Sequence, residues 1–521
     1  MAPLSLPSAD PQPLDAGPQR TDAFHRHPLF AVTPEPGHGG GPQVVRTWQE
    51  AHALHGPARP ADVNPAYVAA LISDNHRADV APYHRIRRLP RAHDVLIAPD
   101  GAIHTTPYDP LAGGAAAMEA ERLHLFLRSG LVDQVRRALE GHHGPIGCEH
   151  SSGLDSNAVL GALIHGAGLP PERLHTWSFE SRGEQRLLEQ WRLFFRLIPT
   201  QCHRSLLQDR WLEEGDGPLL QQLLVFGAPA QIGGHPDAVA HLGPRGCTLL
   251  FSGFGGDQAL SHNANNVPTD LVARGRWREL IAWMGGRRAA LRVAGGRTLG
   301  LLHRPWAERR VWRHSQAFRP NDLLIRTLTV AGQTWLSPHL RPSYPWERDG
   351  YLLQRTSIRR RVLADWVAVR VEEENRLAAA HGVRKVFPLL AEDLIATLLR
   401  QDPVLFGEGP GRGRLLHRRA FAPFLPPPLR DNPTKDRHGE GALDQWRAEA
   451  LGRQTGVLAR GLAAADSWSP ALARWWDLAA IRQEAETLLE RSDSQLGAVM
   501  GTNQALATMA RLSGWWHALE G

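Results

Sequence analysis

The fold of this chain is decided by the stretch Pro145-Ile146-Gly147-Cys148-Glu149-His150-Ser151-Ser152-Gly153-Leu154-Asp155-Ser156-Asn157. A short apolar run predicts a buried strand, a Ser/Gly-rich bend follows it, and helical spacing resumes from Ala158. Such a strand-loop-helix unit can cradle an anion, because backbone N–H groups and a helix N-terminus face it. A plain strand-to-helix turn with an Asp or Ser N-cap has the same local pattern, so the motif alone leaves both interpretations open.

Side chains in this bend extend the anion chemistry. Ser151, Ser152 and Ser156 supply hydroxyl groups that can donate to phosphate oxygens. Asp155 would repel a bare phosphate, but it is explained if Mg²⁺ lies between its carboxylate and the phosphate oxygens. The loop therefore predicts a magnesium-polyphosphate site.

A second stretch has matching chemistry. Residues 247–251 read Cys-Thr-Leu-Leu-Phe, which predicts another buried strand. The strand runs into Ser252-Gly253-Phe254-Gly255-Gly256-Asp257, again small residues that end in one Asp. Two strand ends of the same character predict two walls of one site.

Both loops resemble signatures of the asparagine synthetase family. Ser151-Ser-Gly-Leu-Asp-Ser156 is similar to its pyrophosphate loop Ser-Gly-Gly-Leu-Asp-Ser, and the second loop is similar to its Ser-Gly-x-Gly-x-Asp loop. The resemblance implies that Asp155 and Asp257 hold Mg²⁺ on the pyrophosphate of ATP. It also implies ATP contacts from Ser151, Ser152, Gly153, Leu154, Asp155, Ser156, Ser252, Gly253, Phe254 and Gly255, and from Ser178 on the strand that holds the adenine.

One departure from the family pattern is Ser152, which stands where the first glycine is expected. Because Ser152 carries a Cβ atom, the loop is expected to keep a negative φ there.

Strands alternating with helices predict an α/β fold with a doubly wound parallel sheet and a helical C-terminal part. The predicted strands include residues 174–180, and the predicted helices include residues 116–140, 184–196, 219–225 and 270–284. By resemblance, the sheet is of the adenine-nucleotide α-hydrolase type with a pyrophosphate loop. Residues 116–521 are assigned to this amide synthetase domain.

The N-terminal part divides into two predicted segments. Residues 1–24 are rich in Pro, Ser, Asp and Gln and are expected to be disordered. Residues 25–115 alternate short apolar runs, such as residues 30–32, with turns, and Asp100-Gly101 is a strong hairpin signal. Residues 82–101 resemble the end of the family's glutaminase domain. A working glutaminase needs an N-terminal cysteine, and this chain has none before Cys148, so a degenerate domain that takes no ammonia from glutamine is implied.

Later segments also resemble the family. Residues 381–391 are similar to its Gly-x-Glu-x-Arg-x-Pro-Phe-Leu-Asp segment, with Ala391 in place of the Asp, and residues 412–420 are similar to its Lys/Arg-Leu-Leu-Arg signature. Lys435 matches the active-site lysine, whereas Lys385, the other of only two lysines, lies in a segment where no cation is required. The resemblance covers roughly residues 82–521.

A long helical pattern over residues 352–380 carries Glu372, Glu373 and Glu374. The ordinary interpretation of such a charge run is a solvated face. One of these acids could instead serve as a general base, and Glu374 is our candidate, with Lys435 as the catalytic cation.

Composition excludes several classes of protein. The net charge of +6 comes from arginines spread along the chain, without the basic and aromatic clusters of a nucleic-acid binder. No apolar run is long enough for a membrane span, and residues 1–20 lack the core of a signal peptide. Three cysteines without a Cys-x-x-Cys pair predict core thiols in a reducing compartment, so a cytoplasmic location is expected.

The family activates a carboxylate as an acyl-adenylate, which an amine attacks to give an amide, AMP and pyrophosphate. Phe254 stands where asparagine synthetases have Glu and β-lactam synthetases have Tyr, and it can neither accept nor relay a proton. The resemblance therefore implies an amine supplied by the substrate itself, closest in character to lasso-peptide cyclases. The partners would be a carboxylate substrate, or a precursor peptide and its leader protease.

Four alternatives stay open. A β-lactam synthetase-like or other small-molecule amide synthetase fits the same loops, and so does an asparagine synthase that uses ammonia. A catalytically dead ATP-binding protein is disfavoured by the intact Asp155, Asp257 and Lys435. An ATP pyrophosphatase acting on tRNA is disfavoured because a basic-aromatic patch and thiolation cysteines are missing.

Overall fold

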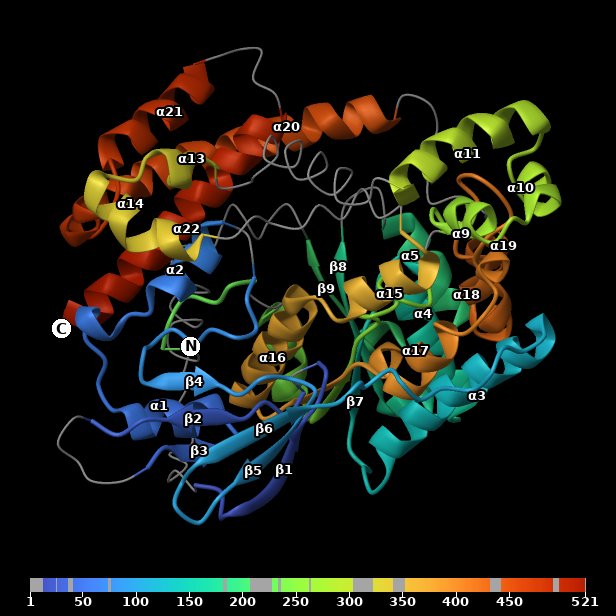
Figure 1. Cartoon of the computed structure of the whole chain (residues 1–521), viewed down its shortest axis with the longest axis horizontal. Coiled ribbons are helices and arrows are strands. Elements are labelled where there is room, and N and C mark those ends of the chain that lie inside the picture. Colours follow the sequence, from blue (N-terminus) through green and yellow to red (C-terminus); the bar gives the residue numbers. More distant parts are fainter. Residues whose placement is uncertain are drawn as a thin grey trace.

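A computed structural model gives the arrangement of the chain, with a central sheet flanked by helices (Figure 1). It describes residues 13–24, 26–35, 41–73, 76–180, 185–206, 227–232, 236–261, 264–302, 322–340, 352–431, 442–490 and 496–520.

The central sheet has five parallel strands in the order β11-β10-β7-β8-β9. Their bounds are Ile146–Glu149 for β7, Leu174–Glu180 for β8, Cys202–Leu206 for β9, Leu249–Phe251 for β10 and Arg384–Val386 for β11. Strand order reverses between β7 and β10, which is the point where doubly wound sheets bind ligands. The predicted α/β class with a parallel sheet is confirmed, and both predicted loops follow strands on either side of the reversal.

Both faces of this sheet are buried. On β10, Leu249 and Phe251 belong to one apolar cluster and Leu250 to another, as alternate side chains of an internal parallel strand should. One cluster is covered by α3 (Ala120–Leu139), α4 (Leu154–Gly161), α5 (Gln185–Phe194), α17 (Glu392–Leu398) and α18 (Leu415–Ala420), and the other by α8 (Pro236–Leu242) and α16 (Asp365–Ala380). The sheet is therefore sandwiched between two helical layers.

The N-terminal region forms two antiparallel sheets with three strands each, β1-β5-β6 and β3-β2-β4. The predicted strand at residues 30–32 and the predicted hairpin are confirmed, because β2 and the β5-β6 pair lie there. The bounds are Gly17–Thr21 (β1), Phe30–Val32 (β2), Gln43–Val45 (β3), Ile86–Arg88 (β4), His93–Ile97 (β5) and Ile103–Pro107 (β6).

The predicted disorder of residues 1–24 is wrong for residues 17–21. This segment is β1, an edge strand that pairs with β5 from Gly17 opposite Ile97 to Thr21 opposite His93. Its backbone pairing stabilises it although few of its side chains are buried, so the sequence carries no apolar alternation that would reveal it. Residues 1–12 lie outside the described part of the chain.

A second large core joins the N-terminal helices to the last helices of the chain. It contains Tyr67 and Tyr83 together with Trp476 and Trp515, and the Trp515 indole N–H donates to the Tyr83 hydroxyl at 3.1 Å. Figure 1 shows these blue and red segments on the same side of the molecule. The helices concerned are α1 (Trp48–His55), α2 (Pro65–Ile72), α20 (Ala442–Ala464), α21 (Leu478–Glu490) and α22 (Leu496–Glu520).

The predicted long helix over residues 352–380 is wrong, because it is broken into α15 (Gln354–Val362) and α16. The Arg91 guanidinium donates to the carbonyl of Leu363 and, at 3.2 Å, to that of Ala364. A side chain from the N-terminal region thus satisfies carbonyl groups that a continuous helix would have bonded internally.

The prediction of a solvated face for Glu372, Glu373 and Glu374 is also wrong, since these residues are 1%, 1% and 2% exposed. Glu372 pairs with Arg88 and Arg376, and Glu373 accepts the backbone N–H of Gln231 at 2.7 Å. Each acid is compensated by a partner from another part of the chain or from the next helical turn, which a single helical pattern cannot reveal.

The region after the second loop is helical, as predicted, although the pattern at residues 270–284 is divided between two helices. These helices are α9 (Val267–Ala273), α10 (Trp277–Trp283), α11 (Arg287–Leu302), α13 (Asp322–Arg326) and α14 (Val330–Leu336), while α19 (Pro427–Asp431) follows α18. Of the helices in the described ranges, none has the length and hydropathy needed to span a membrane.

The Glu372–Arg88 pair gives a test of this fold. Arg88 Nη2 and Glu372 Oε1 lie 2.9 Å apart, and both side chains are 1% exposed. Glu372→Gln leaves two guanidinium groups buried beside a neutral amide, so we expect unfolding in denaturant to become easier by about 3–5 kcal/mol. The matched control is Glu408→Gln, because Glu408 pairs with Arg419 at the surface and should contribute less than about 1 kcal/mol. Equal effects of the two substitutions would contradict the buried network.

Candidate active site

The first loop lies between β7 and α4, at the carboxyl edge of the central sheet. Ser151 Oγ and Ser156 Oγ are 2.8 Å apart, and the Gly153 backbone N–H donates to Ser151 Oγ at 3.1 Å. Asn157 Nδ2 donates to the carbonyls of Ser151 and Gly153 at 2.9 and 2.6 Å. These bonds hold the loop in one shape. Ser152 does not have a positive φ, so that prediction is confirmed.

The second loop packs directly against the first. A Cβ atom on Gly256 would lie 2.2 Å from Asp155 Cγ, and one on Gly253 would lie 2.5 Å from the backbone nitrogen of Ser156. Gly255 has a φ of +104° and packs against Leu390. Only glycine permits these approaches, so the Gly-rich sequence brings the Asp155 carboxylate against the second loop. Ser252 closes the strand end, with its hydroxyl accepting the Phe254 N–H at 3.2 Å.

Helix α18 approaches both aspartates. Arg414, the residue before α18, places its guanidinium 2.5 Å from Asp257 Oδ1, and His417 Nδ1 lies 3.4 Å from Asp155 Oδ1. The Ser261 hydroxyl also donates to Asp155. Arg414 adopts a backbone φ of +63°. Residues other than glycine rarely take this conformation, and those that do are concentrated at functional sites.

The imidazole of His417 is fully buried. Burial, with a contribution from the nearby Arg414 charge, lowers the pKa of His417 to about 3. The ring is therefore neutral at physiological pH, and it adds no positive charge beside Asp155.

The two aspartates fit a Mg²⁺ ion in their chemistry. Mg²⁺ takes one or two protein carboxylates and completes its coordination with phosphate and water oxygens. Within the described ranges, no group of three or more His, Cys, Asp or Glu side chains is arranged to hold a metal. An ion at Asp155 and Asp257 would compete with Arg414 for Asp257.

Phe254 contacts two aromatic rings and the guanidinium of Arg370. Its ring lies edge-on to Trp366 and Phe387, with centroids 5.6 and 6.0 Å apart, and the Arg370 guanidinium stands 4.3 Å from the ring centroid. Arg370 Nε donates to Glu374 Oε1 at 2.7 Å. The second loop thus presents an aromatic ring with a cation over it, not an acid or a phenol.

Glu374 lies in a buried chain of charges that reaches the end of β7. Lys385 Nζ is 2.6 Å from Glu374 Oε2, and it also pairs with Glu149. Burial lowers the pKa of Lys385, but Glu149 and Glu374 outweigh burial and raise it above its usual value. Lys385 is therefore a charged structural link between β7, β11 and α16, a role that its sequence context did not reveal.

Ser178 is buried on β8, the strand next to the first loop. Its hydroxyl donates to Glu180 Oε1 at 2.5 Å, and Arg192 Nη2 donates to Ser178 Oγ at 2.8 Å. The Ser178 side chain thus belongs to a polar cluster beneath the surface, and an adenine contact at this position would come from the strand backbone.

Some of the residues predicted from the sequence lie outside the part of the chain that the structure describes. Lys435 lies outside the described residues, as does the predicted helix at residues 219–225. Conversely, Arg414, His417 and Ser261 contact the aspartates although sequence reasoning gave them no role. Arg414 and His417 lie in the segment that resembles a family signature, so a signal existed for them. Ser261 has no local signal, because only the fold brings it to Asp155.

The close packing of the two loops predicts that an added methyl group at Gly256 weakens nucleotide binding. Gly256→Ala would push a methyl group into the Asp155 carboxylate, so we expect magnesium-dependent nucleotide binding to weaken by about tenfold or more. Titration calorimetry with a non-hydrolysable ATP analogue measures this. Gly295→Ala on α11 is the control, since it meets open space and should leave binding unchanged. Unchanged binding in Gly256→Ala would show that the ligand does not depend on this contact.

Comparison with known proteins gives a match over the region that contains this site. A family model described as asparagine synthase matches residues 127–500, which include both loops, α16 and α18. No curated protein gives a significant match to the chain. The matched region covers well over half of the 521 residues. This family indicates an ATP-dependent ligase that forms carbon–nitrogen bonds, and the chain belongs to the asparagine synthase family.

Proposed function

We propose that the protein joins a carboxylate to an amine through an acyl-adenylate, releasing pyrophosphate and AMP. The observation that carries this proposal is the contact between two Asp-ended loops on the adjacent strands β7 and β10. This arrangement supplies carboxylates, hydroxyl groups and a helix N-terminus at one point, as an ATP pyrophosphate requires.

In the first step, a carboxylate oxygen of the substrate attacks the α-phosphorus of ATP, and the bond to the pyrophosphate oxygen breaks. Negative charge grows on the departing pyrophosphate. Asp155 and Asp257 would hold Mg²⁺, which neutralises this charge when bound. The backbone N–H groups at the start of α4 and the ammonium of Lys435 are proposed to stabilise the same charge.

In the second step, the amine attacks the carbonyl carbon of the adenylate, the amide bond forms, and AMP leaves. The amine must lose a proton, and Phe254 cannot accept it. Glu374 remains our candidate for the general base. It is 1% exposed in its side chain and paired with Lys385 and Arg370, so Arg370 would have to move for Glu374 to reach a substrate amine.

We further propose that the amine belongs to the substrate itself, as in a lasso-peptide cyclase that makes a macrolactam or isopeptide bond in natural-product biosynthesis. The aromatic ring and cation at Phe254 and Arg370 support an amine delivered by the substrate over free ammonia. A cytoplasmic enzyme that works with a precursor peptide and its leader protease is the corresponding setting. A small-molecule synthetase of the β-lactam type or an ammonia-dependent asparagine synthase is the alternative.

ATP–pyrophosphate exchange tests the first step. Wild-type enzyme should exchange labelled pyrophosphate into ATP only with its own acid, found in a panel of amino acids, small carboxylic acids and precursor peptides. Asp155→Asn should lower the exchange rate by about 10²-fold or more, because a carboxylate that holds Mg²⁺ is lost. Asp133→Asn on α3 is the control for a lost charge elsewhere. Undiminished exchange in Asp155→Asn would refute the proposed metal site.

Glu374→Gln separates two roles of the buried acid. If Glu374 is the general base, exchange persists, amide formation falls by about 10²-fold, and the remaining activity loses its dependence on an ionised base. If Glu374 only neutralises Lys385 and Arg370, exchange and amide formation fall together with the unfolding temperature. Parallel measurement of exchange, amide product and unfolding temperature distinguishes these outcomes, and the second would remove Glu374 from the catalytic residues.

A further inference from the structure

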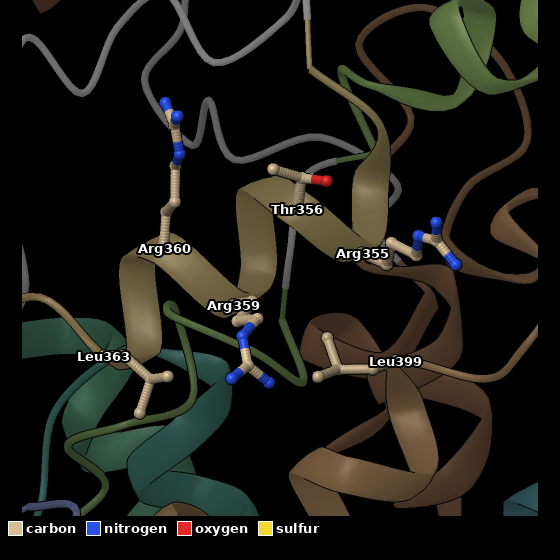
Figure 2. Close-up of a pocket in the computed structure, with 6 residues that line it drawn as sticks. All are labelled: Arg355, Thr356, Arg359, Arg360, Leu363 and Leu399. Carbon is tan, nitrogen blue, oxygen red and sulfur yellow. The ribbon is translucent and has the colours of Figure 1, made fainter. Parts of the chain in front are cut away.

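A basic pocket lies beside α15, outside the two loops. It has a volume of about 590 Å³ and is lined by Arg355, Thr356, Arg359, Arg360, Leu363 and Leu399 (Figure 2). Its volume is within the range of about 300–1,000 Å³ that is typical of ligand sites. In the part of the chain that the structure describes, this lining includes three guanidinium groups and no acidic side chain.

One charge of this pocket, on Arg359, is held only weakly by its present partner. Arg359 pairs with Asp109 at 2.8 Å, but the two side chains are 40% and 45% exposed, so the pair is held weakly. Arg359 and Arg360 lie in the last turn of α15, where cations also stabilise the helix dipole. Arg355 lies in the first turn, where the dipole disfavours a cation, and its charge interacts with the Asp270 carboxylate of α9.

The arrangement of the side chains indicates the kind of anion. Figure 2 shows the three guanidinium groups projecting in different directions from the helix, with the Arg359 guanidinium between Leu363 and Leu399 in this view. Groups that do not converge on one point suit several carboxylates spaced along a chain better than a single phosphate. The leucines suit the hydrocarbon parts of a peptide. The lining has none of the aromatic side chains on which nucleic-acid bases stack.

Both ends of α15 are tied to the segment that follows β10. The backbone N–H of Gln354 donates to Asp270 of α9 at 2.6 Å. At the other end, three residues beyond Leu363, Trp366 packs against Phe254 of the second loop with ring centroids 5.6 Å apart. A peptide bound along α15 would therefore lie next to the elements that frame the candidate active site.

We propose that the α15 pocket binds an acidic peptide segment and so recruits the substrate chain. The identification of this peptide as the substrate rests on the proposed amide synthesis, whereas the binding itself does not. Arg355 and Arg360 provide the charge, and Leu363 and Leu399 contact the peptide's aliphatic groups.

Fluorescence anisotropy with a labelled tetraglutamate peptide, without ATP, tests this binding. Tetraglutamate should bind the full-length protein about tenfold more tightly than tetraglutamine, and about 0.3 M salt should weaken it. Arg355→Gln/Arg360→Gln should lower the affinity by about tenfold. Arg137→Gln on α3, whose Nε donates to the backbone carbonyl of Asp133 in the same helix, is a control for the loss of an exposed charge elsewhere and should have no effect. Equal unfolding temperatures would show that both variants are folded.

Two results would overturn the proposal. One is equal tetraglutamate affinity in the wild type and in Arg355→Gln/Arg360→Gln. The other is displacement of tetraglutamate by an oligothymidylate of similar charge at equal concentration, which would make the pocket a nucleic-acid site. ATP–pyrophosphate exchange is measured separately, so a protein that binds tetraglutamate but shows no exchange would refute the proposed function and leave the peptide site standing.

Discussion

The contact between Gly256 and the Asp155 carboxylate is the constraint on which the site depends. There is no room for a Cβ atom between them, and a Cβ atom on Gly253 would likewise collide with the backbone of Ser156. These approaches occur because β7 and β10 are neighbours in the sheet although about a hundred residues separate them in the chain. Because of this strand order, the loops after β7 and β10 form one surface that carries two carboxylates.

The rest of the structure holds that surface in place. Arg414 and Ser261 fix the orientation of the aspartates, and each comes from an element that follows the second loop in the chain. On the other side, Glu149, Lys385 and Glu374 tie β7 to β11 and α16 through buried charges. Buried charged groups that are paired are costly to rearrange, so these pairs hold the ends of β7 and β11 at fixed positions beside the site.

Sequence reasoning was sufficient where a local pattern has one physical meaning. It predicted the strand at residues 174–180, the hairpin at Gly101 and the two loops, because periodicity and glycine placement are local signals. It failed for β1 and for Glu372, Glu373 and Glu374, whose environments come from distant partners. It also missed the helix break at Leu363. There Arg91, from a segment far away in the chain, donates to a carbonyl group that a continuous helix would have bonded internally.

The central claim is that both aspartates act on one magnesium-bound nucleotide. A double-mutant cycle of Asp155→Asn and Asp257→Asn measures this directly, with a non-hydrolysable ATP analogue titrated by calorimetry in the presence and absence of Mg²⁺. A shared ion predicts a coupling energy of about 1–3 kcal/mol that appears only with Mg²⁺. Additive losses under both conditions would show that Asp155 and Asp257 belong to separate sites, and would contradict the account.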